Sequence, residues 1–302
     1  MFKISLRGRV LIFIFFLALT TMAEVKKEFG EFVVTHVDTL KNQKVVQRHY
    51  SSRSLFKGLF GFNWCSTLDY RLTIEDSIIT VFDCELGRTL SFKKSKSGVF
   101  QNTRLQLEIT EKKQQWQWIR PPNTYVFSQE GRLNYWIDHD NNIVYIDYRD
   151  RLPHRLLSKK TGPLVIESTS SGVIKKIGPT LIYEYSQNLL NKVINKKKRT
   201  WQYQYDEFLN MTLWRGPSSY ESMKYDSEWD RIIFLKDQRD CRFRYQYEIK
   251  KNKKFIVESK KCLNAAEHET LFEVTPPRPI IKTLNDQLGN EFRQGAHHED
   301  VY

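Results

Sequence analysis

This 302-residue sequence lacks the short motifs that mark common catalytic sites. It contains no G-x-S-x-G, no H-E-x-x-H and no S-x-x-K followed by S-D-N, which argues against serine hydrolases, zinc peptidases and penicillin-recognising enzymes. Asp226 and Glu228 lie two residues apart, but any strand with two acidic residues at that spacing would imitate a glycosidase pair. We therefore expect a protein that is not an enzyme and needs no cofactor.

Metal-binding patterns are equally weak. The segment 138–142 begins like a calcium loop, but Ile143 and Arg149 occupy the positions where an EF-hand requires Gly and Glu. A turn rich in Asp and Asn is the better interpretation of that segment. The acidic and histidine-rich segment 297–300 lies in a polar tail without a core pattern. We expect no bound metal at either place.

Long apolar runs are missing after residue 19. The one such run is ten residues long, at positions 10–19, with three basic residues before it and small residues at 21–23. This arrangement is typical of a secretory signal peptide, and a membrane-spanning helix would need about 20 apolar residues. We predict a signal peptide over 1–23 and export to the periplasm or the cell exterior. An uncleaved anchor is the alternative.

Cysteines are few and widely spaced. The four are Cys65, Cys84, Cys241 and Cys262, and no C-x-x-C pair occurs, which argues against a zinc site. In an oxidising compartment an even number of cysteines indicates disulfides. Three pairings are possible, and the sequence does not choose among them, although proximity favours Cys65–Cys84 and Cys241–Cys262. Reduced, buried thiols are the alternative.

Acidic residues are outnumbered, and the formal net charge is +13. The basic excess is concentrated in short runs at 196–199, 250–254 and 260–261. In an exported protein such runs are suited to contact with anionic envelope polymers or lipid head groups. The alternative is that they are solvated hairpin tips that discourage aggregation. Nucleic acid is not an expected partner, because an exported protein meets little of it.

Aromatic residues are plentiful and recur at an interval of twenty. Six of the 15 tyrosines follow this interval, and a valine fills its one gap: Tyr125, Tyr145, Val165, Tyr185, Tyr205, Tyr225 and Tyr245. Twenty residues accommodate two strands and two turns. Aromatic and polar residues alternate in 201–205 and 243–247, and Leu133, Tyr135 and Ile137 suggest a similar face. We predict repeated β-hairpins whose aromatic faces stack on one another.

The repeated segments resemble a known family. The segment 225–232 (YDSEWDRI) is similar to the YD repeat of Rhs and related bacterial proteins, roughly Y-D-x-x-G-x-R-L. Residues 205–206 match its opening pair, and 131–133 match its closing G-R-L. Leu209 and Trp229 occupy the usual glycine position. The resemblance therefore implies degenerate copies of the repeat.

Two upstream segments extend the resemblance. Residues 60–72 and 87–92 are similar to the module that precedes YD repeats in that family. The resemblance implies a spiralling β-sheet, which in long members encloses a C-terminal toxin. This sequence has few repeats, no Asp-Pro dipeptide for self-cleavage, and a polar tail after residue 275 in place of a toxin. We therefore do not expect it to encapsulate a toxin.

The expected fold is all-β, with repeated hairpins forming a twisted antiparallel sheet or partial shell. We predict an N-terminal β module over 24–120, YD-like hairpins over 121–275 beginning at Pro121-Pro122, and a mobile tail over 276–302.

The leading functional hypothesis is an exported, non-enzymatic binding or scaffold protein of the bacterial cell envelope. Its partner would be an anionic polymer, a glycan or another protein. The residues expected to make that contact are Trp116, Trp118, Gln202, Gln204, Arg242 and Arg244. For the two tryptophans, which share a strand face, the alternative is that they pack between the two modules. The alternatives are a glycan-active enzyme with a carboxylate pair and a shortened Rhs-like segment that serves a neighbouring protein.

Overall fold

The computed structural model describes residues 21–40, 43–250, 253–263 and 265–273, and almost all of its named elements are β-strands. The predicted all-β fold of repeated hairpins is therefore confirmed. The predicted signal peptide lies outside the described residues, apart from 21–23, which belong to the first strand. The predicted tail, 276–302, lies entirely outside them.

Two small sheets form what we call the central module, residues 21–70. One has the strand order β1-β2-β3-β6, and the other pairs β4 with β5. Its elements are β1 (Thr21–Lys26), η1 (Lys27–Phe29), β2 (Glu31–Leu40), β3 (Gln43–Ser51), β4 (Lys57–Gly58), β5 (Gly61–Phe62), β6 (Trp64–Ser66) and η2 (Thr67–Asp69).

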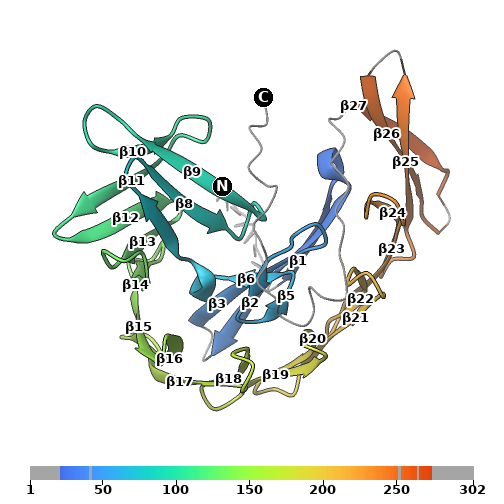
Figure 1. The fold of residues 1–302 in the computed structure, drawn as a ribbon. Helices are drawn as coiled ribbons and strands as arrows, with labels where there is room; N and C mark the ends of the chain where they lie inside the picture. Colours follow the sequence, from blue (N-terminus) through green and yellow to red (C-terminus); the bar gives the residue numbers. More distant parts are fainter. Residues whose placement is uncertain (1–20, 41–42, 251–252, 264, 274–302) are drawn as a thin grey trace, which may run out of the picture.

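A long antiparallel sheet follows and curves around the central module (Figure 1). It contains β7 to β27, each hydrogen-bonded to the next strand in the sequence. Its first half comprises β7 (Leu72–Glu75), β8 (Ile78–Asp83), β9 (Arg88–Lys94), β10 (Phe100–Asn102), β11 (Leu107–Lys112), β12 (Gln115–Arg120), β13 (Asn123–Phe127), β14 (Leu133–Ile137), β15 (Ile143–Arg149), β16 (Leu152–Ser158) and β17 (Gly162–Ser168). Its second half comprises β18 (Ile174–Ile177), β19 (Leu181–Ser186), β20 (Leu189–Ile194), β21 (Thr200–Tyr205), β22 (Met211–Arg215), β23 (Tyr220–Tyr225), β24 (Ile232–Asp237), β25 (Arg242–Lys250), β26 (Lys253–Lys261) and β27 (His268–Glu273).

The sheet continues through Pro121-Pro122, where we expected the hairpin repeats to begin. Strands β12 and β13 pair on either side of this turn, with Arg120 opposite Asn123. The two prolines therefore make a tight connection inside one sheet, and hydrogen bonding is not interrupted there.

Two rows of side chains cross the strands that open successive hairpins. The inner row is buried and consists of Tyr125, Ile146, Ile166, Tyr183, Tyr203, Met223 and Tyr245. The second row lies two residues later in each strand and consists of Phe127, Tyr148, Ser168, Tyr185, Tyr205, Tyr225 and Tyr247. A β-bulge directly precedes the second-row residue in β13, β15, β17, β19, β21 and β23.

Five second-row tyrosines connect neighbouring strands through their hydroxyl groups. Each donates to the carbonyl of the first or second residue of the preceding strand: Tyr148 to Leu133 (2.8 Å), Tyr185 to Ile174 (2.6 Å), Tyr205 to Leu190 (2.8 Å), Tyr225 to Met211 (3.0 Å) and Tyr247 to Ile232 (2.6 Å). A largely buried hydroxyl needs a partner. This recurring bond gives the tyrosine spacing its physical basis.

The sequence predicts that residues twenty apart occupy equivalent positions in successive hairpins. In the structure they do not. Tyr125 and Tyr245 belong to the inner row, whereas Tyr185, Tyr205 and Tyr225 belong to the second row. Tyr145 and Val165 point outward and are each 48% exposed. The repeat length varies between hairpins, so a fixed step drifts from one row to the other.

The face predicted for Leu133, Tyr135 and Ile137 is also wrong. Leu133 is buried, but Tyr135 is only half-buried and lies 5.1 Å from the ring of Tyr145. The bulge at Val126/Phe127 shifts the register, so that the inner side of β14 continues with Trp136. Bulges re-aim side chains in this way, and strict alternation cannot anticipate them.

The turns between strands use a side-chain oxygen at their first position. The carboxylate of Asp206 accepts the backbone N–H groups of Phe208 and Asn210, and Leu209 adopts φ +68°. Leu209 thus occupies the left-handed position that we assigned to a repeat glycine. Trp229 does not, because the next turn is one residue longer and its left-handed residue is Asp230, with φ +53°.

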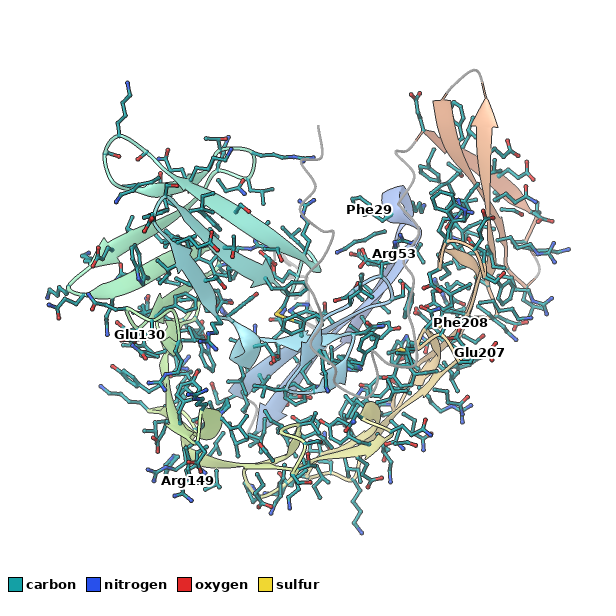
Figure 2. The ribbon with its side chains drawn as sticks, viewed as in Figure 1. Phe29, Arg53, Glu130, Arg149, Glu207 and Phe208 are labelled. Atoms are coloured by element: carbon teal, nitrogen blue, oxygen red, sulfur yellow. A yellow bond between two sulfur atoms is a disulfide. The ribbon has the colours of Figure 1, made fainter. Side chains whose placement is uncertain are left out.

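The central module bonds to the hairpin connections along the inside of the sheet. The bonds run from Ile174 N to Leu59 O (2.7 Å), Met211 N to Tyr50 Oη (2.7 Å) and Ile232 N to Gly30 O (2.9 Å). Directly after the module, Leu72 N of β7 donates to Gly131 O (2.8 Å). Arg53 also donates to the carbonyl of Trp229, and Figure 2 shows it on the inner side of the sheet, opposite to Arg149 on the outer side. Gly61 lies so close to Asn188 O that a Cβ would stand 2.5 Å from it.

We predict that Tyr205→Phe lowers the free energy of unfolding by about 1–3 kcal/mol. The substitution removes the donor to Leu190 O and the acceptor for Trp64 Nε1, which lies 3.0 Å from the hydroxyl. The matched control is Tyr145→Phe, whose hydroxyl belongs to an exposed ring. Urea unfolding should show a change below about 0.5 kcal/mol for the control, and equal losses would contradict the role of the hydroxyl bond.

We predict opposite effects for glycine at two neighbouring lysines. Lys198 is exposed with φ +55°, a conformation that costs a non-glycine residue about 1–2 kcal/mol. Lys198→Gly should therefore stabilise the fold by up to about 1 kcal/mol, whereas Lys197→Gly should destabilise it by about 0.5–1 kcal/mol. Denaturation midpoints measure both, and a shift in the same direction would refute the turn geometry.

Candidate functional site

A buried ion pair joins the central module to the sheet. The guanidinium of Arg48 donates to both carboxylate oxygens of Asp38, at 2.6 and 3.0 Å, and Tyr183 Oη donates to Asp38 Oδ2 at 2.8 Å. The guanidinium also lies over the rings of Phe60 and Trp64, 5.4 and 5.0 Å from their centroids. Burial, the largest single effect, opposes the charge of Arg48, but Asp38 together with Tyr203 and Tyr183 outweighs it and raises the Arg48 pKa. Arg48 is 0% exposed and Asp38 is 6% exposed, and their contact with Tyr183 of the sheet suits a role in orienting the module.

Two histidines of the module are buried and neutral. Burial lowers the pKa of His36, and the nearby charge of Arg48 lowers it further. Burial also lowers the pKa of His49 to about 3, with smaller contributions from Lys44 and Lys26. Neither imidazole therefore serves as a general base that titrates near neutral pH.

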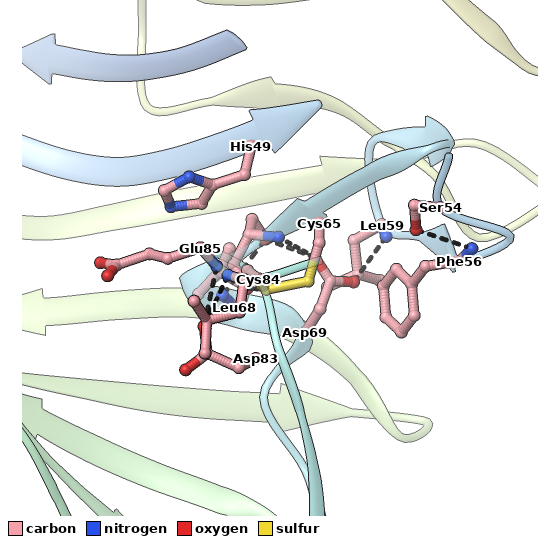
Figure 3. Close-up of a disulfide and its surroundings, with 12 residues drawn as sticks. His49, Ser54, Phe56, Leu59, Cys65, Leu68, Asp69, Asp83, Cys84 and Glu85 are labelled. Atoms are coloured by element: carbon pink, nitrogen blue, oxygen red, sulfur yellow. Dashed lines mark hydrogen bonds between the residues drawn. A yellow bond between two sulfur atoms is a disulfide. The ribbon is translucent and has the colours of Figure 1, made fainter. Parts of the chain in front are cut away.

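The first disulfide, Cys65–Cys84, ties the module to the start of the long sheet (Figure 3). Beside it, the Asp69 carboxylate accepts the backbone N–H groups of Leu59 and Ser66, both at 2.7 Å, and the Ser66 hydroxyl at 2.5 Å. Burial raises the pKa of Asp69 to about 6, although these three donors oppose the shift. Because all its bonds serve local folding, we assign Asp69 a structural role.

The second disulfide, Cys241–Cys262, connects the turn before β25 to the end of β26. Both disulfides have the pairing that sequence proximity favoured.

The outer surface of the sheet carries paired charges in the hairpins opened by β15, β17 and β19. In these three strands the residue before the second-row residue is acidic and faces a basic residue on the next strand, whereas in β13 it is the buried Val126. The pairs are Asp147–Arg155 (2.7 Å), Glu167–Lys176 (3.0 Å) and Glu184–Lys192 (3.1 Å). The two charges of each pair compensate one another, while Arg149, exposed on the same side of β15, forms no ion pair among the described residues.

The same positions change chemistry in the last hairpins. Gln204, Lys224 and Gln246 replace the acids, and they face Leu213, Phe234 and Val257 respectively. Exposed cations remain on this surface, namely Arg215, Lys224, Arg242, Arg244 and Lys261. Among the residues that the structure describes, none of these five forms an ion pair. We call the outward residues of β21–β26 the C-terminal outer face.

Four of the six predicted contact residues lie on this face. Gln202, Gln204, Arg242 and Arg244 are all exposed. Gln204 and Arg242 belong to one cross-strand row, which passes through β22, β23 and β24. Four strand spacings separate them, or about 19 Å. These residues therefore share one surface without meeting at a single point.

The two predicted tryptophans lie elsewhere and differ from each other. Trp118 is 0% exposed and packs against Tyr70 and Tyr125, so it is corrected from a contact residue to a core residue. Trp116 is half-buried, packs on Phe100 at 5.6 Å and donates from Nε1 to a backbone carbonyl. The two rings share a face as predicted, but that face is the interior.

A hollow of about 320 Å³ opens at the end of the C-terminal outer face. Its charged and polar lining consists of Asp240, Arg242, Arg244, Ser259, Lys261 and Glu267, and Cys262 also contributes to it. The sequence identified the two arginines, but it did not show which residues face them across the strands.

One pair of acidic residues lies in a smaller hollow of about 220 Å³. Glu221 and Asp237 are direct cross-strand partners, and burial raises the pKa of Glu221. Each carboxylate is already engaged, because Glu221 accepts from Trp214 Nε1 and Asp237 accepts from the Arg239 and Cys241 backbone. This pair therefore closes a turn. Asp226 forms an ion pair with Arg231 at 2.8 Å, which leaves no paired role with Glu228.

The candidate metal sites remain weak. Asp138, His139 and Asp140 bring ligand atoms within 4.8 Å of one another. The Asp138 carboxylate, however, accepts the backbone N–H groups of Asp140 and Asn142, as expected for a turn. The segment 297–300 lies outside the described residues.

Comparison with known proteins gives one partial match. Residues 29–92 match the model of a domain of unknown function, DUF6531. This stretch runs from the end of η1 into β9, so it includes most of the central module and the first strands of the long sheet. No curated protein matches the chain. The match ends before the predicted YD-like segments. The resemblance of those segments to the YD repeats of Rhs proteins stays a prediction.

Within the described ranges, we find no helix whose length and apolar character would let it cross a membrane.

We predict that acid destabilises the fold partly through His49. Its pKa is about 3 in the folded protein and about 6.5 when unfolded, so the unfolded chain binds the extra proton as pH falls below 6.5. Stability should then decrease by up to about 1.4 kcal/mol per pH unit for this residue. His49→Gln should reduce the loss between pH 6.5 and 5 by about 1–2 kcal/mol.

The control for this measurement is His139→Gln, at an exposed histidine. Chemical denaturation at pH 6.5 and 5.0 gives the change in unfolding free energy for each protein. The burial argument fails if His49→Gln and the control show the same pH dependence as the wild type.

Proposed function

We propose that this chain is an exported, non-enzymatic binding or scaffold protein of the bacterial cell envelope. The central module holds the curved sheet rigid, and the C-terminal outer face contacts an anionic polymer or an anionic protein surface.

The observation that carries this proposal is the change in charge pairing along the outer surface. In the hairpins from β15 to β20, three acidic residues pair with three basic residues across neighbouring strands. In the last hairpins the equivalent acids are absent and five cations stand without an ion pair among the described residues. Unpaired cations beside amide and apolar side chains suit an extended anionic partner.

Because the inner side of the sheet is filled, a role as a scaffold is better supported than a role as a container. The resemblance to YD-repeat proteins raises the possibility of a shell with cargo inside. Here the central module packs against that inner side, where Tyr50 bonds to Met211 and Trp64 bonds to Tyr205. The outer surface is therefore the natural place for a partner.

The two disulfides support export. Disulfides persist in oxidising compartments and are rare in the cytosol. They fit the predicted signal peptide over residues 1–23, and the basic C-terminal outer face then meets anionic envelope polymers after export.

The alternative functions receive less support. A glycan-active enzyme needs two free carboxylates, whereas Glu221 and Asp237 are held by Trp214 and by a turn.

A shortened Rhs-like segment that serves a neighbouring protein would use the same outer surface. Purification from the native host distinguishes this case, because a protein partner would then co-purify in place of an envelope polymer.

We predict that the mature chain binds dextran sulfate, used as a polyanion probe, with an affinity that decreases as salt increases. The triple variant Arg215→Gln, Lys224→Gln and Arg244→Gln should bind about tenfold more weakly, because each exposed pair contributes about 0.5 kcal/mol. The control is the triple variant Lys93→Gln, Lys96→Gln and Lys113→Gln, at three exposed lysines outside this face.

Both triple variants change the net charge by the same amount, so titration of each separates local contact from overall attraction. The control should lose less than about twofold in affinity. An equal loss of affinity in both variants, or a wild-type affinity that does not change with salt concentration, would overturn the proposal.

A further inference from the structure

The second disulfide stands beside two like charges that face each other. Arg242 and Lys261 are direct cross-strand partners in β25 and β26. Arg242 follows Cys241 and Lys261 precedes Cys262 in the sequence, and these cysteines form the disulfide. The disulfide therefore fixes the strand register at the very place where both side chains carry positive charge.

This arrangement is unfavourable in the absence of a ligand. Directly opposed residues in antiparallel strands have Cβ atoms about 4.5–5.5 Å apart, and like charges there are destabilising. The next residue in the same row, Lys236, is neutralised by Asp240 at 2.5 Å. No described acid forms an ion pair with Arg242 or Lys261. Residues held against their own repulsion are commonly residues retained for a function.

A third cation and a hydroxyl complete the group. Arg244 lies two residues from Arg242 on the same face, about 7 Å along the strand, and it faces Ser259 across the strands. All four side chains line the hollow of about 320 Å³. The two acidic residues of the lining are engaged with neighbours. Asp240 pairs with Lys236, which lowers the pKa of its carboxyl most, and Arg242 adds a smaller effect in the same direction; Glu267 accepts from the Ser259 hydroxyl.

We propose that this hollow binds a phosphate group, and that Arg242 and Lys261 bind it from opposite strands with Arg244 as the third cationic donor. The inference rests on the proposed function and gives its ligand a chemistry. Guanidinium groups match the oxygens of phosphate in a two-point contact, and a lysine adds a point charge. A phosphate group presents oxygens in several directions, so one group can contact all three cations at once. Neither acidic residue of the lining forms an ion pair with any of the three.

The test compares inorganic phosphate binding with stability for the same variants. Isothermal titration of the oxidised mature protein with phosphate, at constant ionic strength, should give one saturable site. Arg242→Gln combined with Lys261→Gln should bind phosphate at least tenfold more weakly. Lys93→Gln combined with Lys96→Gln, which changes the net charge equally at exposed residues outside this face, should bind it within about twofold of the wild type.

A stability measurement separates a ligand site from a structural one. Without phosphate, Lys261→Gln should raise the urea midpoint, because it removes the repulsion from Arg242. With saturating phosphate, the wild type should gain stability and the variant should gain little. A lower midpoint for Lys261→Gln without phosphate, or equal phosphate affinity in all variants, overturns the inference.

Two further titrations distinguish this inference from the proposed function and identify the source of the group. Polyphosphate that binds much more tightly than inorganic phosphate, with the same dependence on Arg242 and Lys261, would indicate a phosphate borne on a polymer. Similar affinities would indicate a free phosphate group. Binding of dextran sulfate without any phosphate binding would refute the inference and leave the proposed function intact, whereas the reverse would refute the proposed function alone.

Discussion

The architecture depends on a hydrogen bond between a tyrosine hydroxyl and the carbonyl at the start of the preceding strand. The bond recurs from Tyr148 to Tyr247, with oxygen–oxygen distances between 2.6 and 3.0 Å. A bulge directly precedes four of these five tyrosines, and bulges bend and twist the strand. Tyr247 forms the same bond without a bulge in the pairing of β25 with β26. The bond therefore connects neighbouring strands where the second-row residue is tyrosine, and the bulges curve the sheet.

Curvature creates an inner side that must be filled, because a sheet face of tyrosine and aliphatic residues is unstable in water. The central module fills it, and it does so with polar as well as apolar groups. The Arg48–Asp38 pair meets Tyr183, and Tyr50 meets the backbone of Met211. Buried polar groups stabilise only when their partners are correctly placed. These contacts consequently fix which hairpin lies over which part of the module, in a way that apolar packing alone would not.

The sequence predicted the strand class, the hairpin repeat and the disulfide pairs that proximity favoured, because each depends on local pattern. It failed where a single residue changed the register. Tyr135 and Tyr145 follow the expected alternation, yet the bulge at Phe127 and the drifting repeat length place them outside. Trp118 became a core residue for a long-range reason, since Tyr70 of the module packs against it. Contacts between distant segments leave no periodic signal, so alternation alone did not decide between a contact role for this ring and packing between the modules.

Of the candidate site, Gln202, Gln204, Arg242 and Arg244 could be assigned to an outward face from alternation alone. Their possible role in binding could not be recognised from alternation, because it depends on comparing equivalent outward positions in successive hairpins. Those equivalent positions are known only once the strand register is known. Once strands are aligned on the second-row tyrosine, the residue before it reads Asp147, Glu184, Gln204 and Lys224 in successive tyrosine-bearing hairpins. The inner side is held constant by the tyrosine bond and the module, so the outer side is free to change without loss of fold. A surface that is released from structural constraint, and yet loses its acids while retaining its cations, is the surface on which selection for a partner can act.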